Sequence, residues 1–315
     1  MTKRVLLGDV GGTNVRFAVL ADAALGAIAH MAVADYASFG DALAAFLARH
    51  PEPIGHAVFG VAGVVEGERC ALTNSPWVVD AAELNARLGL SDVRLVNDFE
   101  AIAWSLPKLA RQDLRKLGGG EPKPEAPMLV LGPGTGLGVA AYVPRGPIVL
   151  HSEGGHTSLP GGSPREDAVI AALRRQFGHV SAERVLSGHG LENLYRAVAA
   201  LDAAKAPERS AAEITQAALA GNCPASRAAL DLFCALLGEV AGNFALSFCA
   251  EGGIFIAGGI VRHIGDYLAR SQFRARFEAK GRMSAYVAPI PAYLIVHRDP
   301  AFLGLQALAA QCQPA

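Results

Sequence analysis

Two glycine-rich segments, each with one threonine, have the composition of phosphate-binding turns. The first glycine segment, residues 8–14, follows the opening apolar run and consists of Gly8, Asp9, Val10, Gly11, Gly12, Thr13 and Asn14. The second glycine segment, residues 132–138, also follows an apolar run and consists of Gly132, Pro133, Gly134, Thr135, Gly136, Leu137 and Gly138. Glycines let the backbone bend until successive N–H groups face one anion, and a threonine adds a hydroxyl donor. Both segments therefore predict phosphate binding.

An ordinary β-hairpin turn would explain either glycine segment alone equally well. Asp9 favours the phosphate interpretation, because a carboxylate beside such a turn can hold a hydrated Mg²⁺. Neither segment contains G-x-x-x-x-G-K-[ST] or G-x-G-x-x-G, so P-loop and dinucleotide-binding folds lose support. Two such segments in different halves of the chain indicate a clamp around the phosphates.

The elements around the first glycine segment alternate between strand and helix. The apolar runs Arg4 to Asp9 and Val15 to Leu20 predict a hairpin that turns at this segment. Further along, His56 to Val61 and Val93 to Val96 predict buried strands, and Ala42 to Leu47 has a helical pattern. Alternation of this kind predicts an α/β domain.

The second half of the chain repeats the strand–glycine–strand pattern and then becomes helical. Met128 to Gly132 and Gly138 to Val143 predict a second hairpin, so two similar lobes are implied. The later expected elements are capping boxes at Ser163–Glu166 and Ser210–Glu213, a long helix from Ser226 to about Cys249, strands at 253–257 and 293–296, and a final helix from Pro300 to about Ala310. We expect this last helix to pack back on the first domain.

These elements predict two domains. We expect a small α/β domain at residues 1–108, completed by the C-terminal helix 298–315, and a large α+β domain at residues 109–297. The segment Leu117 to Pro127, with three glycines and three prolines, is the candidate connection between them.

Composition restricts the classes of partner. The 315 residues include 28 basic and 29 acidic side chains, so no net charge favours nucleic acid or an anionic membrane. Five widely spaced cysteines argue against a complete disulfide framework and favour the reducing cytoplasm. No apolar stretch is expected to reach the length of a membrane span; the strongest candidate, Ile254 to Ile260, contains two glycines. We expect small-molecule partners, no nucleic acid and no membrane.

Three segments in the same order resemble the phosphate and adenosine motifs of the superfamily of sugar kinases, heat-shock chaperones and actin. They are the two glycine segments and Phe255-Ile256-Ala257-Gly258-Gly259-Ile260. More narrowly, Leu95 to Phe99, Glu153 to His156 and His179 to Gly188 resemble the bacterial glucokinase family, nearly from end to end of the chain. The resemblance implies the two-lobed actin-like ATPase (ribonuclease H-like) fold, with a cleft between its domains, ATP and Mg²⁺ as cofactors, and a homodimer. The cysteine-rich zinc motif of the related repressor/kinase group is missing, so no structural zinc is expected.

The resemblance also assigns roles to individual residues. Asp98 matches the general base that takes the proton from the sugar 6-hydroxyl. Asn97, Asp98, Glu153, His156 and Glu183 match sugar-binding positions, since hydroxyl groups need converging donors and acceptors. Asp9 matches the metal position. The remaining nucleotide positions are Gly8, Val10, Gly11, Gly12, Thr13, Gly134, Thr135, Gly136, Gly258 and Gly259.

Less specific explanations remain open for several of these residues. Asp98 alone would serve equally as a helix N-cap, Glu183 as a solvated helix residue and His156 as a loop histidine. His179, His189, Trp77 and Trp104 are interpreted as structural.

The same family motifs leave other activities open. They suit a kinase for another hexose or amino sugar, one that uses polyphosphate as its phosphate donor, or an ATP-switched sugar sensor without catalysis. Only eight residues precede Asp9, so no DNA-binding domain of a repressor is expected there.

Overall fold

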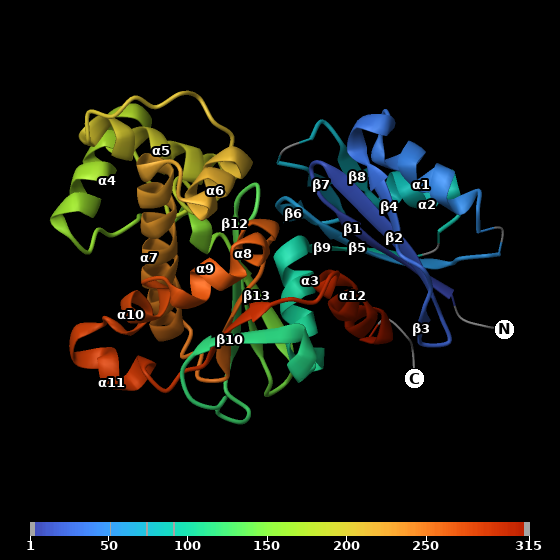
Figure 1. Ribbon diagram of the computed structural model, residues 1–315. Coiled ribbons are helices and arrows are strands. Elements are labelled where there is room, and N and C mark those ends of the chain that lie inside the picture. Colours follow the sequence, from blue (N-terminus) through green and yellow to red (C-terminus); the bar gives the residue numbers. More distant parts are fainter. Residues whose placement is uncertain (1–3, 51, 74, 91, 312–315) are drawn as a thin grey trace. The chain divides into compact units, whose positions relative to one another are not determined.

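The computed structural model describes residues 4–50, 52–73, 75–90 and 92–311 (Figure 1). The chain divides into two compact units, residues 1–110 with 297–315, and residues 111–296. The residues at the end of the expected final helix, 312–315, lie outside the described residues.

The first unit is built on a sheet with the strand order β3-β2-β1-β5-β9, and β4 pairs with β2. Its strands are β1 (Arg4–Val10), β2 (Asn14–Ala21), β3 (Ala24–Leu25), β4 (Ala29–Ala32), β5 (His56–Val61) and β9 (Asp92–Asn97). The hairpin of β1 and β2 and the two later strands are confirmed, with β5 and β9 continuing the sheet in parallel from β1. In this register Val10, Val61 and Asn97 lie side by side. The carboxyl ends of three strands therefore meet at one edge.

Helices and a small second sheet complete the first unit. The helices are α1 (Phe39–Leu47), α2 (Ala81–Leu88), α3 (Asp98–Ser105) and α12 (Pro300–Gln311), and the second sheet is β6 (Val65–Glu66), β7 (Arg69–Ala71) and β8 (Val78–Asp80). α1 begins where the Ser38 side chain accepts the Asp41 N–H, and α2 begins where Asp80 accepts the Glu83 N–H. The core between α1 and the sheet contains the contacting rings of Phe17, Phe39, Phe46 and Phe59.

The final helix packs on α3, so the expected return of the chain to its first domain is confirmed (Figure 1). The approach is very close, because a Cβ added at Gly304 would lie 1.7 Å from the carbonyl oxygen of Ala101 on α3. Only glycine allows the two helix backbones to meet at this distance.

The second unit has a six-stranded sheet in the order β10-β15-β14-β11-β12-β13. The strands are β10 (Leu114–Gly118), β11 (Met128–Pro133), β12 (Leu137–Val143), β13 (Ile148–Ser152), β14 (Gly253–Ile256) and β15 (Ala292–Ile295). β11 and β12 form the predicted second hairpin, and β14 runs parallel to β11 with Leu131 opposite Ile256. The ends of β11 and β14 therefore lie at the same edge.

The expected connection between domains at residues 117–127 is wrong. The chain passes from the first unit to the second at Ala110–Arg111, and residues 117–127 lie inside the second unit after β10. Its glycines serve close backbone packing instead: the Gly120 N–H donates to the Pro289 oxygen at 2.9 Å. A Cβ at Gly119 would lie 2.2 Å from the Ile290 oxygen.

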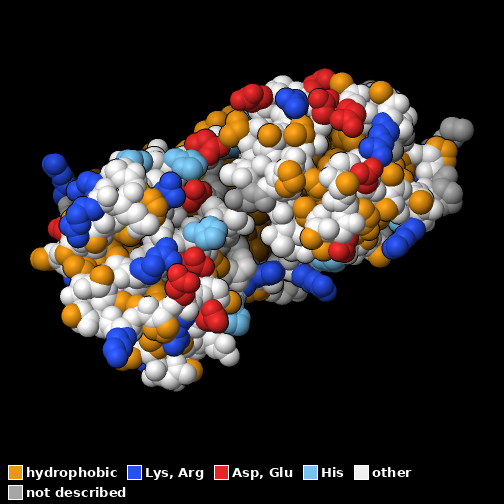
Figure 2. Space-filling view, turned by 90° about the horizontal axis from the view of Figure 1, so that it is seen from above, with side chains coloured by type: hydrophobic (Ala, Val, Ile, Leu, Met, Phe, Trp, Pro, Cys, Tyr) orange, Lys and Arg blue, Asp and Glu red, His pale blue; other side chains and the backbone are white. Residues whose placement is uncertain are grey.

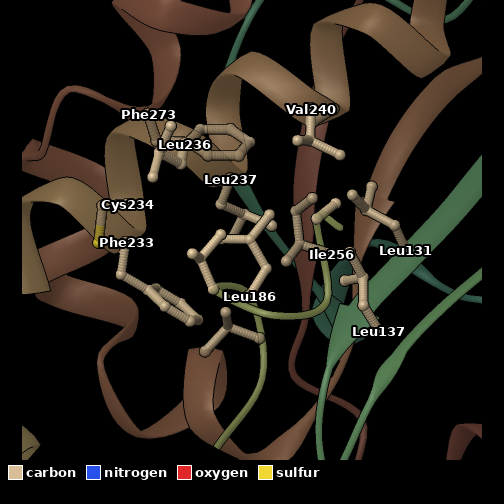
Figure 3. Close-up of a cluster of buried hydrophobic side chains, with 14 of the residues drawn as sticks. Leu131, Leu137, Leu186, Phe233, Cys234, Leu236, Leu237, Val240, Ile256 and Phe273 are labelled. Carbon is tan, nitrogen blue, oxygen red and sulfur yellow. The ribbon is translucent and has the colours of Figure 1, made fainter. Parts of the chain in front are cut away.

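The helices of the second unit surround one long helix. They are α4 (Pro164–Phe177), α5 (Gly188–Leu201), α6 (Ala211–Ala220), α7 (Pro224–Ser247), α8 (Gly259–His263), α9 (Gly265–Arg270), α10 (Phe273–Glu278) and α11 (Ser284–Val287). α7 contacts α5, α6 and α10. Figure 3 shows its apolar residues among side chains from the sheet, including Leu131, Leu137 and Ile256.

α7 also corrects the expectation about membrane spans, because it is long and apolar enough to cross a membrane. However, 72% of its most apolar 18-residue window is buried within the protein. Its apolar surface therefore belongs to the core of the second unit.

On the face seen in Figure 2, basic and acidic side chains are interspersed.

Only one of the two expected capping boxes is complete. At α6 the Ser210 side chain accepts the Glu213 N–H, and the Glu213 carboxylate accepts the Ser210 N–H. At α4 Ser163 caps the helix, but the Glu166 carboxylate accepts the Gly162 N–H and pairs with Arg276 at 2.8 Å. Because Glu166 is almost fully buried, its carboxylate pairs with the charged guanidinium of Arg276 and does not complete the capping box.

Candidate active site

The first glycine segment turns at the carboxyl edge of the first unit's sheet. The Gly11 N–H donates to the Asn14 oxygen at 3.0 Å, which closes the turn, and Thr13 is exposed. The backbone carbonyl oxygen of Thr13 accepts the Val33 N–H at 2.9 Å. Gly8 lies deeper, where a Cβ would approach the Phe59 ring to 2.5 Å, so packing also requires glycine at this position.

Asp9 lies at the end of β1 and is largely buried. Its Oδ2 accepts a hydrogen bond from Arg16 Nη1 at 2.7 Å, and Arg16 Nε lies 3.7 Å from Asp299 Oδ1. Burial raises the pKa of Asp9 above its usual value, although Arg16 opposes this shift. The pair of Asp9 and Arg16 therefore places one carboxylate, already balanced by a guanidinium, beside the first glycine segment.

A single carboxylate in this position fits a hydrated Mg²⁺ better than an all-protein metal cage. No group of three or more metal-ligating side chains occurs among the described residues. Mg²⁺ in kinase sites is commonly held by one or two carboxylates together with water and substrate phosphates. Asp9 Oδ1 accepts no hydrogen bond within the part of the chain that the structure describes, so it is the oxygen suited to this ion.

The second glycine segment turns at the carboxyl edge of the second unit's sheet. The Gly134 N–H donates to the Gly136 oxygen at 2.8 Å, and the Gly188 N–H donates to the Gly134 oxygen at 2.9 Å. Thr135 is exposed at the tip. The start of α5 therefore holds this turn from one side.

Gly258 and Gly259 connect β14 to α8 next to the second glycine segment. Gly258 has a φ of +108°, which L side chains rarely adopt, and a Cβ there would lie 2.3 Å from the Pro133 oxygen. No atom lies within 4 Å of a Cβ built on Gly259. The Ala257 N–H donates to the Leu131 oxygen at 2.9 Å, which fixes the register of the two loops. Gly258 of the third motif thus lies against the second glycine segment.

A cavity of about 550 Å³ opens beside these loops, within the second unit. It is lined by Gly134, Thr135, Gly188, His189, Glu192, Ala211, Ala212, Thr215, Ile260 and His263. Its size is within the range of small-molecule sites. Glu192 is held in place, because its carboxylate accepts the Ala211 N–H at 3.1 Å and lies 3.3 Å from His189 Nδ1.

Asn97 and Asp98 lie at the junction of β9 and α3 in the first unit. Asn97 is the N-cap: its Oδ1 accepts the N–H groups of Phe99 and Glu100, and its Nδ2 donates to the Gly63 oxygen at 3.2 Å. Asp98 is the first residue of the helix, and its Oδ1 accepts the Phe99 N–H at 2.9 Å. The capping role that Asp98 could have filled thus belongs to its neighbour.

The start of α3, where Asp98 lies, packs closely on β5. A Cβ added to Gly60 on β5 would lie 3.7 Å from the Asp98 Cα and 3.2 Å from the Ala101 Cβ. Together, burial and the negative charge of Asp98 raise the pKa of Cys70 to about 11. Asp98 is therefore a charged side chain at the same strand edge as the first glycine segment.

Glu153, His156 and Glu183 come together in the second unit as a carboxylate–histidine cluster. His156 Nε2 lies 3.7 Å from Glu153 Oε2, and His156 Nδ1 lies 4.0 Å from Glu183 Oε1. Glu153 and His156 are about 60% exposed, with side-chain values of 62% and 59%, whereas Glu183 is 31% exposed. Residues thirty positions apart in the sequence thus present converging acceptors and an imidazole toward solvent.

Comparison with known proteins identifies the family of the chain. The glucokinase family model matches residues 6–312. A glucokinase of Paramagnetospirillum magneticum is 46% identical over 315 residues, which cover 98% of each chain. The chain belongs to the glucokinase family.

Solved structures related to this family share the fold. A glucokinase from an Antarctic psychrotroph has a TM-score of 0.88 at 33% identity, covering 98% of this chain and 99% of the other. A ROK family glucokinase from Streptomyces griseus, in complex with glucose and AMPPNP, has a TM-score of 0.66 at 17% identity, covering 98% and 99%. The fold class predicted from the sequence, an actin-like two-domain α/β kinase, is confirmed.

Sequence reasoning missed part of the cavity wall. His189 was interpreted as structural, and Glu192, Thr215 and His263 were not considered, yet all four line the cavity. Gly188 ends the family motif at residues 179–188, so this motif was a signal that the helix after it borders the site. Nothing local relates residues 211–215 to that helix, because α5 and α6 meet only through tertiary packing.

Proposed function

We propose that this chain transfers the γ-phosphate of ATP to the 6-hydroxyl of D-glucose, giving glucose 6-phosphate and ADP. Membership of the glucokinase family supports this reaction, and the Streptomyces griseus relative binds both glucose and an ATP analogue. The observation that carries the proposal is the position of the carboxylate–histidine cluster directly beside the second glycine segment, joined to it by a hydrogen bond from the Leu137 N–H to Glu183.

In this proposal Asp98 is the general base. Its carboxylate takes the proton from the glucose 6-hydroxyl as that oxygen attacks the γ-phosphorus and ADP leaves. The N-terminus of α3 stabilises the negative charge of the carboxylate, because the Phe99 N–H points at Oδ1. Asn97 caps α3 and so fixes the first turn of the helix, where Asp98 lies.

Glucose binding is assigned to the carboxylate–histidine cluster together with Asn97 and Asp98. Carboxylates accept hydroxyl protons in charge-assisted bonds, and an imidazole can donate or accept. Asn97 and Asp98 come from the first unit, while Glu153, His156 and Glu183 come from the second. The proposal therefore assigns sugar-binding residues to each unit.

The nucleotide is assigned to the glycine segments and the cavity. Backbone N–H groups in the segments would face the phosphates, and the cavity beside Gly134 and Ile260 has room for the adenosine. Mg²⁺ would be held by Asp9 and would neutralise charge on the phosphates. Arg16 keeps the Asp9 carboxylate in place.

The reaction is tested by coupled ADP release with ATP and Mg²⁺ across a panel of hexoses and amino sugars. We expect glucose to give the highest kcat/KM, with mannose and N-acetylated amino sugars well below it. Turnover that favours another sugar would assign a different hexose kinase. Binding of glucose and ATP without ADP release would instead support an ATP-switched sensor.

Two further properties are proposed from the family resemblance. We expect a homodimer, which light scattering on the eluting protein would identify from its molar mass. We also expect a cytoplasmic location, in keeping with the four described cysteines, all of which are free thiols. Fractionation of cells that express the tagged chain tests this location.

A further inference from the structure

Three loops of the second unit are joined to one another at Glu183. The Glu183 N–H donates to the Gly155 oxygen at 2.9 Å, which ties it to the loop that carries Glu153 and His156. The Ser187 hydroxyl donates to the backbone carbonyl oxygen of Glu183 at 2.9 Å, which ties Glu183 to the start of α5. The side chain of Glu183 reaches the second glycine segment. One residue therefore contacts the loop of Glu153 and His156, the second glycine segment and the start of α5.

The two carboxylate oxygens of Glu183 face different partners. Oε2 accepts the Leu137 N–H at 2.9 Å, at the end of the second glycine segment. Oε1 lies 4.0 Å from His156 Nδ1, on the side of the carboxylate–histidine cluster. A carboxylate can accept hydrogen bonds at both oxygens simultaneously, which an amide side chain cannot.

The glycines of both loops make this contact possible. A Cβ on Gly136 would lie 2.4 Å from Glu183 Oε2, and a Cβ on Gly155 would lie 2.2 Å from the Leu137 oxygen. A larger residue at Gly155 would push its loop away from the Leu137 backbone, and one at Gly136 would displace the Glu183 carboxylate from the turn. The two glycines therefore allow the contact between Glu183 and the turn.

We propose that Glu183 is a positioning residue that couples the sugar site to the phosphate turn. It receives a sugar hydroxyl at Oε1 while Oε2 holds the second glycine segment through the Leu137 N–H. Glucose binding then fixes the carboxylate and with it the turn, so each ligand raises the affinity for the other. This inference rests on the proposed function, because it takes glucose and ATP as the ligands.

The variant Glu183→Gln separates the two contacts. Glutamine has one acceptor oxygen and an NH₂ group that only donates, so the Leu137 N–H and the sugar hydroxyl can no longer be accepted at two separate oxygens. Glu153→Gln is the matched control: it makes the same chemical change within the cluster. Glu153 makes no hydrogen bond to the second glycine segment among the described residues.

The experiment is calorimetric titration of the wild type and both variants with AMPPNP and Mg²⁺, without glucose and at saturating glucose. In the wild type we expect glucose to raise AMPPNP affinity by a factor of about 5 to 150. In Glu183→Gln this factor should fall to within about twofold of one, as expected when the coupling contact is lost. AMPPNP affinity without glucose should fall as well. Glu153→Gln should need more glucose but keep the wild-type factor.

A third variant guards against a folding defect in Glu183→Gln. Gly136→Ala leaves the carboxyl group intact but pushes it away from the turn, and it should abolish the same factor while keeping the melting transition cooperative. Retention of the wild-type factor in either variant, or a factor of one in the wild type, would overturn the coupling. Failure of the wild type to bind glucose at all would instead overturn the proposed function.

Discussion

Replacement of Gly304 by alanine tests how the helix that carries Asp98 is held. The new Cβ would lie 1.7 Å from the Ala101 oxygen and 3.0 Å from the Ser105 nitrogen, both on the α3 backbone. Contacts below 3.0 Å are not tolerated, and here no flexible side chain can move aside. The backbones of α3 and α12 must therefore separate by more than an ångström.

The size of the effect follows from this displacement. Overpacking of a well-packed core costs about 1–3 kcal/mol, and the melting temperature of a domain of this size falls by roughly 4 °C per kcal/mol. We expect a fall of roughly 4–12 °C by that conversion. Asp98 lies one helical turn before Ala101, and a misplacement of about 1 Å can lower a rate by about 10²-fold. Turnover should therefore fall far more than the glucose KM rises.

The assay is ADP release together with differential scanning calorimetry. Ala310→Gly is the control, because it weakens the exposed end of α12 by about 0.5–1 kcal/mol through helix propensity alone and adds no atom next to α3. We expect it to lower the melting temperature slightly and to leave kcat unchanged. Gly304→Ala with wild-type stability and turnover would refute the close packing of the two helices.

Other variants and conditions test separate parts of the site. Glu153→Gln and His156→Ala should raise the glucose KM by about tenfold, because each weakens a polar contact, worth about 1–3 kcal/mol, that bound glucose would cover. The ATP KM should change little, and an unchanged glucose KM would remove the cluster from sugar binding. Gly258→Ala should lower the free energy of unfolding by about 2–5 kcal/mol, because of backbone strain at positive φ and the clash with the Pro133 oxygen. It should also raise the ATP KM. Calorimetry and steady-state kinetics that match the wild type would show that the loop is not constrained as described. Removal of Mg²⁺ with a chelator should abolish ADP release, and full turnover without divalent cation would exclude the role given to Asp9.

Much of the fold could be predicted because its elements are encoded locally. The β1–β2 hairpin, the β11–β12 hairpin and the Ser210–Glu213 capping box each depend on residues within a few positions of one another. The packing of the last helix on the first unit was expected from the order of the elements along the chain. These predictions hold because the local pattern and the tertiary structure require the same conformation.

Predictions that depended on distant partners were less successful. The glycines and prolines of residues 117–127 have the composition of a linker, but Gly119 and Gly120 are required by the backbone at residues 289–291. Glu166 was expected to complete a capping box, but it pairs with Arg276, more than a hundred residues later. Composition alone does not show which distant charge or backbone will occupy the space beside a residue.

The candidate site shows the same division. The family resemblance predicted functional roles for Asn97 and Asp98, but the sequence did not show that Asn97 caps the helix and leaves Asp98 as its first residue. It related Glu153 to His156 through their shared loop. The contact of Glu183 with the second glycine segment became visible only in the structure, since 46 positions separate it from Leu137.

The measurement that tests the central claim most directly is the turnover of Asp98→Asn at saturating glucose and ATP. Asparagine can still hydrogen-bond the 6-hydroxyl but cannot take its proton, so kcat should fall by about 10²-fold or more, while glucose affinity measured by calorimetry stays near that of the wild type. Asp92→Asn, at the other end of β9 and exposed, is the matched control and should retain full turnover. Near-normal kcat in Asp98→Asn would contradict the assignment of Asp98 as the general base.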